Sequence, residues 1–129
     1  MKKLKILVLD CNPIIHIGLK SIFKNSMIFE VCAYLDNKNL LIETIGEEKI
    51  DLIISEIDLN GSSAQDILRI LKKNKIDIPV VIFTSLSNEI KSLKLLKTGA
   101  SGFLTKNLKK KLLDIYFKKL HFQDTVLVN

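Results

Sequence analysis

The chain has 129 residues, of which 47% are hydrophobic and 26% are charged, a composition typical of one soluble globular domain. No apolar run approaches the roughly 20 residues of a membrane-spanning helix. The apolar start is interrupted by Lys5 and reaches Asp10 without a small-residue cleavage site, which argues against a secretory signal peptide. Cys11 and Cys32 are too few for a disulfide framework and show no zinc-ligand spacing. We expect a cytoplasmic protein without a membrane segment.

The formal net charge is +6, from 20 basic and 14 acidic residues. Basic proteins often bind nucleic acids. Here Arg69 is the single arginine and the lysines are spread over most of the chain, so no segment resembles an arginine-rich recognition helix. We expect a solvated basic surface and no direct nucleic acid binding by this domain.

Short apolar runs alternate with longer amphipathic segments. The Ile/Val/Leu-rich runs are typical of parallel strands that are covered on both faces, and the segments between them have helical spacing. In chain order, strands are predicted over residues 4–9, 29–35, 51–55, 80–84 and 102–105, with helices near 14–25, 38–48, 62–73, 88–98 and 108–121. Five β-α units in regular alternation predict a doubly wound α/β fold with five parallel strands and five helices.

Four polar residues close four of the predicted strands: Asp10, Glu56, Thr84 and Lys106. In a doubly wound sheet the functional crevice lies at the carboxyl ends of the strands, so we expect these side chains to converge. Each also has an ordinary interpretation: a capping acid, a surface carboxylate, a β-branched strand residue and a solvated lysine. Their joint placement favours a shared site.

Four segments resemble the receiver domain of response regulators: ILVLDCNP (6–13), DLIISEIDLNG (51–61), VVIFTS (80–85) and KTGASGFLTK (97–106). The Asn12-Pro13 step and the last segment are most similar to the NarL/FixJ subfamily. The resemblance spans residues 3–121, and residues 122–129 are expected to be a tail or the start of an interdomain linker. It implies the flavodoxin/CheY-like strand order 2-1-3-4-5.

The resemblance also implies a role for individual residues. Asp10 matches one of two metal-binding acids and Cys11 falls on the other. Glu56 falls on the phosphoacceptor aspartate, and the backbone carbonyl of Asp58 matches a metal ligand. Thr84 and Phe103 match the switch hydroxyl and the switch aromatic, and Lys106 matches the lysine that pairs with the phosphoryl group. For Phe103, an ordinary half-buried strand aromatic is an equal alternative.

Two positions depart from the family pattern. Cys11 replaces a carboxylate by a soft and neutral thiol, which Mg²⁺ does not favour; a redox thiol is the alternative. Glu56 is one methylene longer than aspartate, which would direct its carboxylate toward Thr84 and Lys106 and out of line for attack on a phosphodonor. We therefore expect no cofactor and absent or weak Mg²⁺ binding at Asp10 and Glu56. The hypothesis is a pseudo-receiver whose Glu56 carboxylate pairs with Lys106.

The last predicted helix carries more apolar residues than one face needs. We expect a core face and a second apolar face that supports a homodimer through this helix with the first or fourth helix. The core face would hold Leu108, Leu112, Ile115, Tyr116 and Leu120, and the second face Leu113, Phe117 and Phe122.

These features predict a non-enzymatic, phosphorylation-independent receiver domain. It would regulate transcription through conformation and dimerisation of a longer protein with a C-terminal DNA-binding domain outside this chain. Two alternatives stay open: a stand-alone receiver that acts as a protein-binding adaptor, and a conventional phosphoaccepting receiver in which Asp58 is the only other nearby acid.

Overall fold

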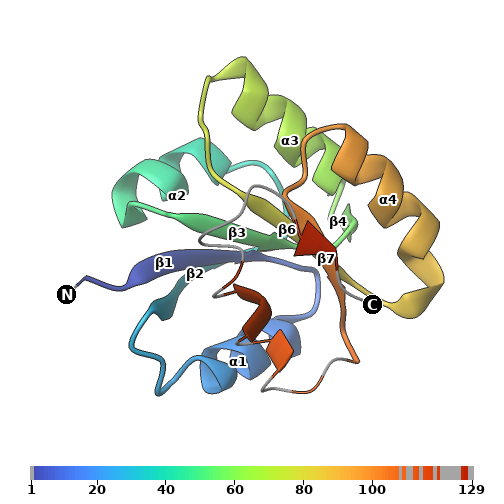
Figure 1. The fold of residues 1–129 in the computed structure, drawn as a ribbon. Helices are drawn as coiled ribbons and strands as arrows, with labels where there is room; N and C mark the ends of the chain where they lie inside the picture. Colours follow the sequence, from blue (N-terminus) through green and yellow to red (C-terminus); the bar gives the residue numbers. More distant parts are fainter. Residues whose placement is uncertain are drawn as a thin grey trace.

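A computed structural model describes residues 2–107, 109, 112–113, 115–117, 119 and 126–127. Its centre is a six-stranded parallel sheet in the order β2-β1-β3-β6-β7-β8 (Figure 1). The first five strands confirm the predicted order of five parallel strands. The strands are β1 (Leu4–Leu9), β2 (Phe29–Leu35), β3 (Leu52–Ser55), β6 (Val80–Thr84), β7 (Gly102–Thr105) and β8 (Val126–Leu127).

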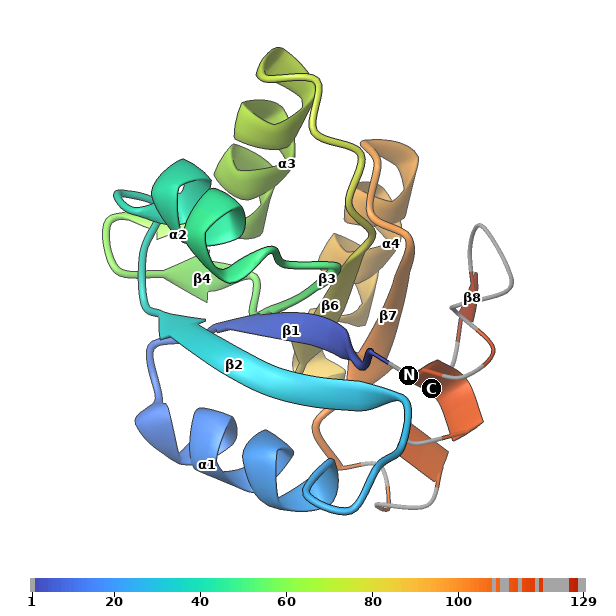
Figure 2. The same cartoon turned by 90° about the vertical axis from the view of Figure 1, so that its left-hand side faces the viewer.

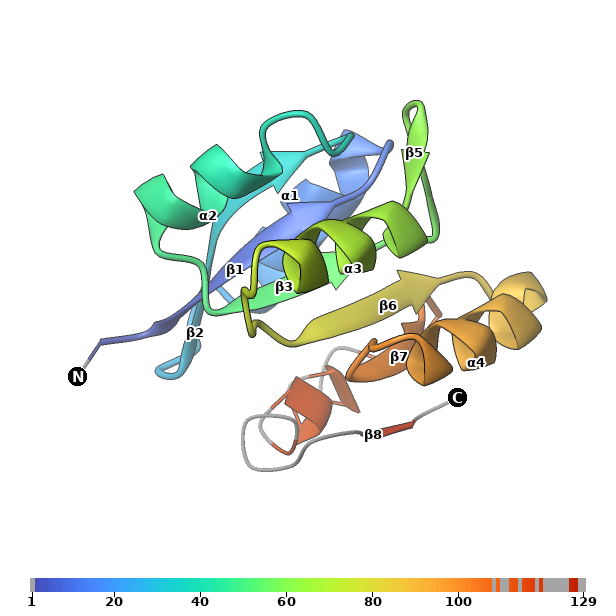
Figure 3. The same cartoon turned by 90° about the horizontal axis from the view of Figure 1, so that it is seen from above.

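The helices cover both faces of this sheet, as Figures 2 and 3 show from two directions. One hydrophobic cluster joins the sheet to α2, α3 and α4, and the other joins it to α1 and to helical residues within 112–119. Strands β3, β6 and β7 are buried along their whole length because both faces are covered, which explains their continuous apolar runs. Among the described residues, no helix combines the length and apolar character that crossing a bilayer requires.

The helices begin where the sequence offers caps. Asn12 accepts a hydrogen bond from the Ile14 amide and Pro13 opens α1, while Ser63 and Asp66 form a reciprocal capping box at α3. The helices are α1 (Pro13–Ile22), α2 (Leu41–Glu48), α3 (Ala64–Lys73) and α4 (Glu89–Lys97), with a short 3-10 turn η1 (Leu86–Asn88) before α4. Helix α2 starts three residues later than predicted, because Asn37 and Lys38 form a turn that ends at the Leu41 amide.

Three short strands were not predicted from the sequence. Strands β4 (Asp58–Leu59) and β5 (Ser62–Ser63) form an antiparallel hairpin around Asn60-Gly61, with Gly61 at φ 65°. An Asn-Gly pair is a strong sequence signal for such a hairpin. Strand β8 falls in the predicted tail, where its apolar residues pair with the otherwise open edge of β7.

The predicted faces of the last helix were largely wrong. Leu113 and Phe117, assigned to the outer face, are 2% and 1% exposed, whereas Leu112 and Ile115, assigned to the core, are 46% and 48% exposed. Tyr116 is buried as expected. Phe117 packs edge-on against Phe23, the C-cap residue of α1, so the aromatic contacts fix the rotation of this segment. The remaining predicted members, Leu108, Leu120 and Phe122, lie outside the described residues.

Candidate functional site

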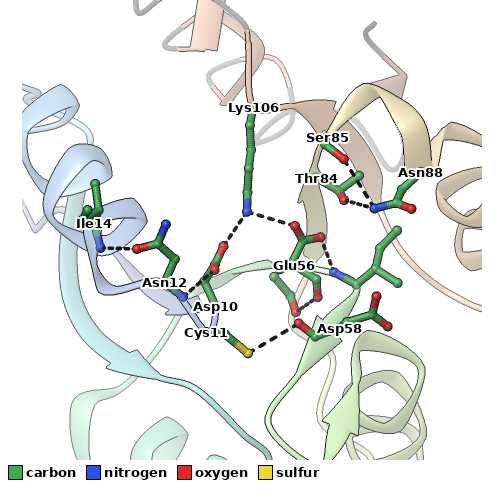
Figure 4. Close-up of polar contacts among 12 residues, drawn as sticks. Asp10, Cys11, Asn12, Ile14, Glu56, Asp58, Thr84, Ser85, Asn88 and Lys106 are labelled. Carbon is green, nitrogen blue, oxygen red and sulfur yellow. Dashed lines mark hydrogen bonds and ion pairs between the residues drawn. The ribbon is translucent and has the colours of Figure 1, made fainter.

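Lys106 joins two carboxylates at the carboxyl edge of the sheet. Its ammonium nitrogen lies 2.9 Å from Asp10 Oδ2, after β1, and 2.9 Å from Glu56 Oε1, after β3 (Figure 4). The Asp10 and Glu56 side chains are 4% and 17% exposed, and that of Lys106 is 25% exposed. Parallel strands end at the same edge, which is why three residues so distant in the sequence meet.

The environment keeps Lys106 charged. Burial lowers the pKa of its ammonium, but hydrogen bonds to Asp10 and Glu56, together with the charges of both carboxylates, raise the pKa above its ordinary value. The site therefore holds one cation between two acidic groups. Such charge-assisted hydrogen bonds are stronger than neutral ones.

Backbone amides hold each carboxylate on its other oxygen. Asp10 Oδ1 accepts a hydrogen bond from the Asn12 amide at 2.9 Å, and Glu56 Oε2 accepts one from the Ile57 amide at 2.6 Å. The Tyr34 hydroxyl donates to the backbone carbonyl of Asp10 at 2.6 Å. The sequence indicated none of these supports. Two of them come from backbone donors, which leave no residue-type signal, and Tyr34 is 24 residues from Asp10 in the sequence.

Thr84 belongs to the same edge but not to the same cluster of hydrogen bonds. Its fully buried hydroxyl accepts a hydrogen bond from Asn88 Nδ2 at 3.1 Å, and no hydrogen bond among the described residues joins it to Glu56. Asn88 stands at the N-cap position of α4 without capping it, because its amide points to Thr84 and Ser85 (Figure 4). The sequence identified Asn88 only as a helix start and so missed this contact.

Cys11 is exposed beside the carboxylates and contacts the first residue of β4. Its thiol donates to the backbone carbonyl of Asp58 at 3.8 Å. Burial and the negative charges of Asp10, Asp36 and Glu56 raise the pKa of the Cys11 thiol. Cys11 is therefore a neutral thiol near pH 7, which is neither a strong nucleophile nor a good metal ligand.

The oxygen ligands at this edge do not fit a divalent cation of the Mg²⁺ type. Asp10 Oδ2 and Glu56 Oε1 already accept from an ammonium, and the Asp58 carbonyl accepts from a thiol. Within the part of the chain that the structure describes, no three His, Cys, Asp or Glu residues are grouped to hold a metal ion. A hard cation needs several free oxygen ligands, whereas a bound ammonium competes with it for the same ones.

Two of the predicted site residues point elsewhere. Phe103 is fully buried in β7 and packs in the core cluster with Ile82 and Leu95. It is therefore more deeply buried than the half-buried strand aromatic that was the alternative prediction. The side chain of Asp58 is exposed and directed away from Lys106, and only its backbone carbonyl takes part in the site (Figure 4). The structure thus brings together Asp10, Glu56 and Lys106, with Cys11 and Thr84 at either side.

Known proteins match most of the chain. The Fimbriae Z protein of Salmonella typhimurium is 25% identical over 116 residues, which are 90% of this chain and 54% of that protein. The nitrate/nitrite response regulator protein homolog of Haemophilus influenzae is 29% identical over 105 residues, 81% of this chain and 50% of that protein. The chain spans about half the length of the curated relatives that it matches.

Solved structures of other proteins share the fold of this chain. The receiver domain of the Francisella response regulator 1452 superposes with a TM-score of 0.78 at 26% identity, covering 93% of this chain and 98% of that one. The isolated receiver domain of RcsB from Salmonella enterica serovar Typhimurium gives a TM-score of 0.84 at 12% identity, covering 99% and 95%. At that identity the likeness shows the fold alone. A family model, the response regulator receiver domain, matches residues 6–117, and the chain therefore belongs to the response regulator receiver domains of two-component systems.

Proposed function

We propose that this chain is a phosphorylation-independent receiver, in which Glu56 supplies permanently the anion that a phosphoryl group supplies transiently in its relatives. The observation that carries the proposal is the 2.9 Å contact between Lys106 Nζ and Glu56 Oε1. The lysine that would pair with a phosphoryl group already has a carboxylate partner. By the family resemblance, Asp10 and Cys11 stand at the two metal-binding positions and Thr84 and Phe103 at the switch positions.

The hydrogen bonds of Glu56 oppose nucleophilic attack. One carboxylate oxygen accepts from the Lys106 ammonium and the other accepts from the Ile57 amide at 2.6 Å. Each oxygen keeps a second lone pair, but the two donors fix the direction of the carboxylate and withdraw negative charge from it, so both make it a weaker nucleophile toward a phosphodonor. The phosphodonor would also approach a site whose first metal-binding carboxylate, Asp10, is itself bound to Lys106.

Glu56 imitates only part of a phosphorylated site. Its carboxylate engages Lys106, while the Thr84 hydroxyl stays bonded to Asn88. The switch hydroxyl is thus held by Asn88 and not by Glu56, and a signal other than phosphorylation would have to act on this contact. A conventional receiver that uses Asp58 is less well supported, because the carboxylate of Asp58 is exposed and points away from Lys106.

The output of this domain would be self-association within a longer transcriptional regulator. Matched relatives are twice as long as the aligned segment, and structures of the relative RcsB include dimers bound to DNA. Apolar side chains are exposed on α1 (Ile14, Ile17) and on the last helix (Leu112, Ile115), and both elements pack through the same core cluster. They support a cytoplasmic homodimer through the last helix with α1; Ile90 and Leu93 of α4 are the second candidate. A stand-alone adaptor would use the same surfaces on another protein.

The test is the mass of the intact chain after incubation with acetyl phosphate and Mg²⁺. The native chain should keep its mass, and the Cys11→Asp/Glu56→Asp variant, which restores both carboxylates, should gain one phosphoryl group. The variant shows that the donor is active. A stoichiometric phosphoryl adduct on the native chain would overturn the proposal.

A further inference from the structure

Six lysines from distant parts of the sequence gather at the end of the sheet opposite the Lys106 site. They line two hollows, of about 490 and 440 Å³, at the amino ends of β1 and β2. The hollows share Lys3, Lys5 and Glu30, so they adjoin and form one extended surface. We name it the basal lysine surface: Lys2, Lys3, Lys5, Lys20, Lys24 and Lys49.

The positive charge of this surface is not neutralised by ion pairs. The ion pairs of the described residues involve only Arg69 and Lys106 as cations, so none of the six lysines has a described carboxylate within 4.0 Å. Three acids, Glu30, Glu48 and Asp51, also line the hollows, and the Asp51 carboxylate is engaged by the Lys5 backbone amide. Six cations against three anions leave a net positive surface.

The helix dipole explains the position of only one of the six basal lysines. Lys20 lies in the last turn of α1, where a cation complements the helix dipole. The other five lysines come from the amino-terminal segment, β1, the turn after α1 and the C-cap of α2. Lys49 occupies that cap in the left-handed region, at φ 55°.

We propose that the basal lysine surface binds the phosphate backbone of DNA. Lysine ammonium groups bind phosphates as point charges, without reading base sequence. The six lysines extend over two adjoining hollows, so the surface can offer ammonium groups to more than one phosphate. A bilayer is a poorer fit, because Phe23, Phe29 and Val31 in the lining are buried and leave no apolar wedge for lipid.

This inference rests on the proposed function, in which a longer regulator holds the domain near DNA and so raises its local concentration there. It also revises the expectation of no nucleic acid binding. That expectation relied on the absence of an arginine-rich recognition helix, which concerns base reading. Backbone contacts need only a localised positive surface, and the sequence did not show that the lysines are localised.

The test compares two variants of equal charge by fluorescence anisotropy with a labelled mixed-sequence DNA duplex of about 30 base pairs at about 50 mM salt. One variant replaces three exposed basal lysines (Lys3→Gln, Lys20→Gln, Lys24→Gln). The matched control replaces three exposed lysines of α4 (Lys91→Gln, Lys94→Gln, Lys97→Gln). Circular dichroism verifies that both fold.

The basal variant should bind at least about tenfold more weakly than the native chain, and its logarithmic salt dependence should be less steep by about 2–3, since each lost phosphate contact contributes about 0.9. The α4 control should stay within about threefold of the native chain. Equal losses in both variants would mean that only net charge matters and would overturn the inference, as would no measurable binding by the native chain. Tighter binding to phosphatidylserine vesicles than to the duplex would replace DNA by a membrane. None of these results bears on the intact-mass test of Glu56.

Discussion

Lys106 donates its ammonium to the Glu56 carboxylate across 2.9 Å, from a strand end 50 residues further along the chain. By the family resemblance, this lysine is the one that pairs with a phosphoryl group. In this chain the protein itself provides the anion, and Asp10 provides a second one at the same distance.

Removing the cation should destabilise the fold. Lys106→Ala would leave Asp10, whose side chain is 4% exposed, without its counter-charge. Losing one partner of a fully buried ion pair costs about 3–5 kcal/mol, and because Lys106 is partly exposed we expect a loss of about 2 kcal/mol in the free energy of unfolding at pH 7. Urea unfolding measures it. The control is Lys94→Ala, an exposed lysine for which a change below about 0.5 kcal/mol is expected. Equal effects of the two substitutions would contradict the account.

Stability should fall at alkaline pH through Lys106. Because its folded-state pKa is raised, the folded chain retains a proton that the unfolded chain releases near pH 10.4. The contribution is complete at neutral pH and is lost as the pH rises through the raised pKa. The raised pKa of Tyr34 acts in the same direction. To isolate the contribution of Lys106, the unfolding free energy of the native chain is compared with that of Lys106→Met. The difference between the two should shrink between about pH 9 and 12. A difference that is constant over this range would show that Lys106 is not held by the carboxylates.

Restoring both carboxylates should restore the metal site. In Cys11→Asp/Glu56→Asp the second acid adds a hard oxygen ligand, and the shorter aspartate side chain at position 56 no longer spans to Lys106 as Glu56 does. Isothermal titration calorimetry should detect millimolar Mg²⁺ binding by this variant. Cys11→Ser, which removes the thiol without adding charge, is the matched control and should not bind. If the double variant ignores Mg²⁺, the assignment of these positions is wrong.

Substitutions that introduce a negative charge can locate the proposed dimer surface. Ile115→Glu and Ile17→Glu place a carboxylate on the exposed apolar faces of the last helix and α1, and each should raise the dimer dissociation constant at least about tenfold. Ile90→Glu makes the same change on α4 and should have no effect if α1 is the partner. Sedimentation equilibrium measures all three. Loss of association only in Ile90→Glu would show that the interface is formed by α4. A native chain that stays monomeric at high concentration would contradict the proposed dimer.

The sequence predicted the long strands and the meeting of Asp10, Glu56 and Lys106, but not the contact of Thr84 with Asn88. Continuous apolar runs located every long strand, and the residues that close them, such as Asp10 and Lys106, had to meet at one edge. The pairing of Glu56 with Lys106 followed from side-chain length and charge. Contacts that depend on backbone donors, such as the Ile57 amide, left no trace in the sequence.

Where several apolar residues compete for one face, sequence pattern failed. The last helix could be rotated in more than one way, because it carries five large apolar residues: Leu112, Leu113, Ile115, Tyr116 and Phe117. Only packing against the rings of Phe23 and Phe29 selects Leu113 and Phe117 for the core. The same limitation applies to Lys3, Lys24 and Lys49. Their convergence depends on chain topology, which composition does not contain.

Lys106 already has an anionic partner in the Glu56 carboxylate. The most direct test is an amide NMR titration of the native chain with Mg²⁺ and beryllofluoride, which imitates a phosphoryl group. We predict that the amide signals of Glu56, Ile57 and Lys106 stay in place at millimolar concentrations of both. Saturable shifts of these three signals would show that the ammonium of Lys106 can exchange Glu56 for another anion, and would contradict the account.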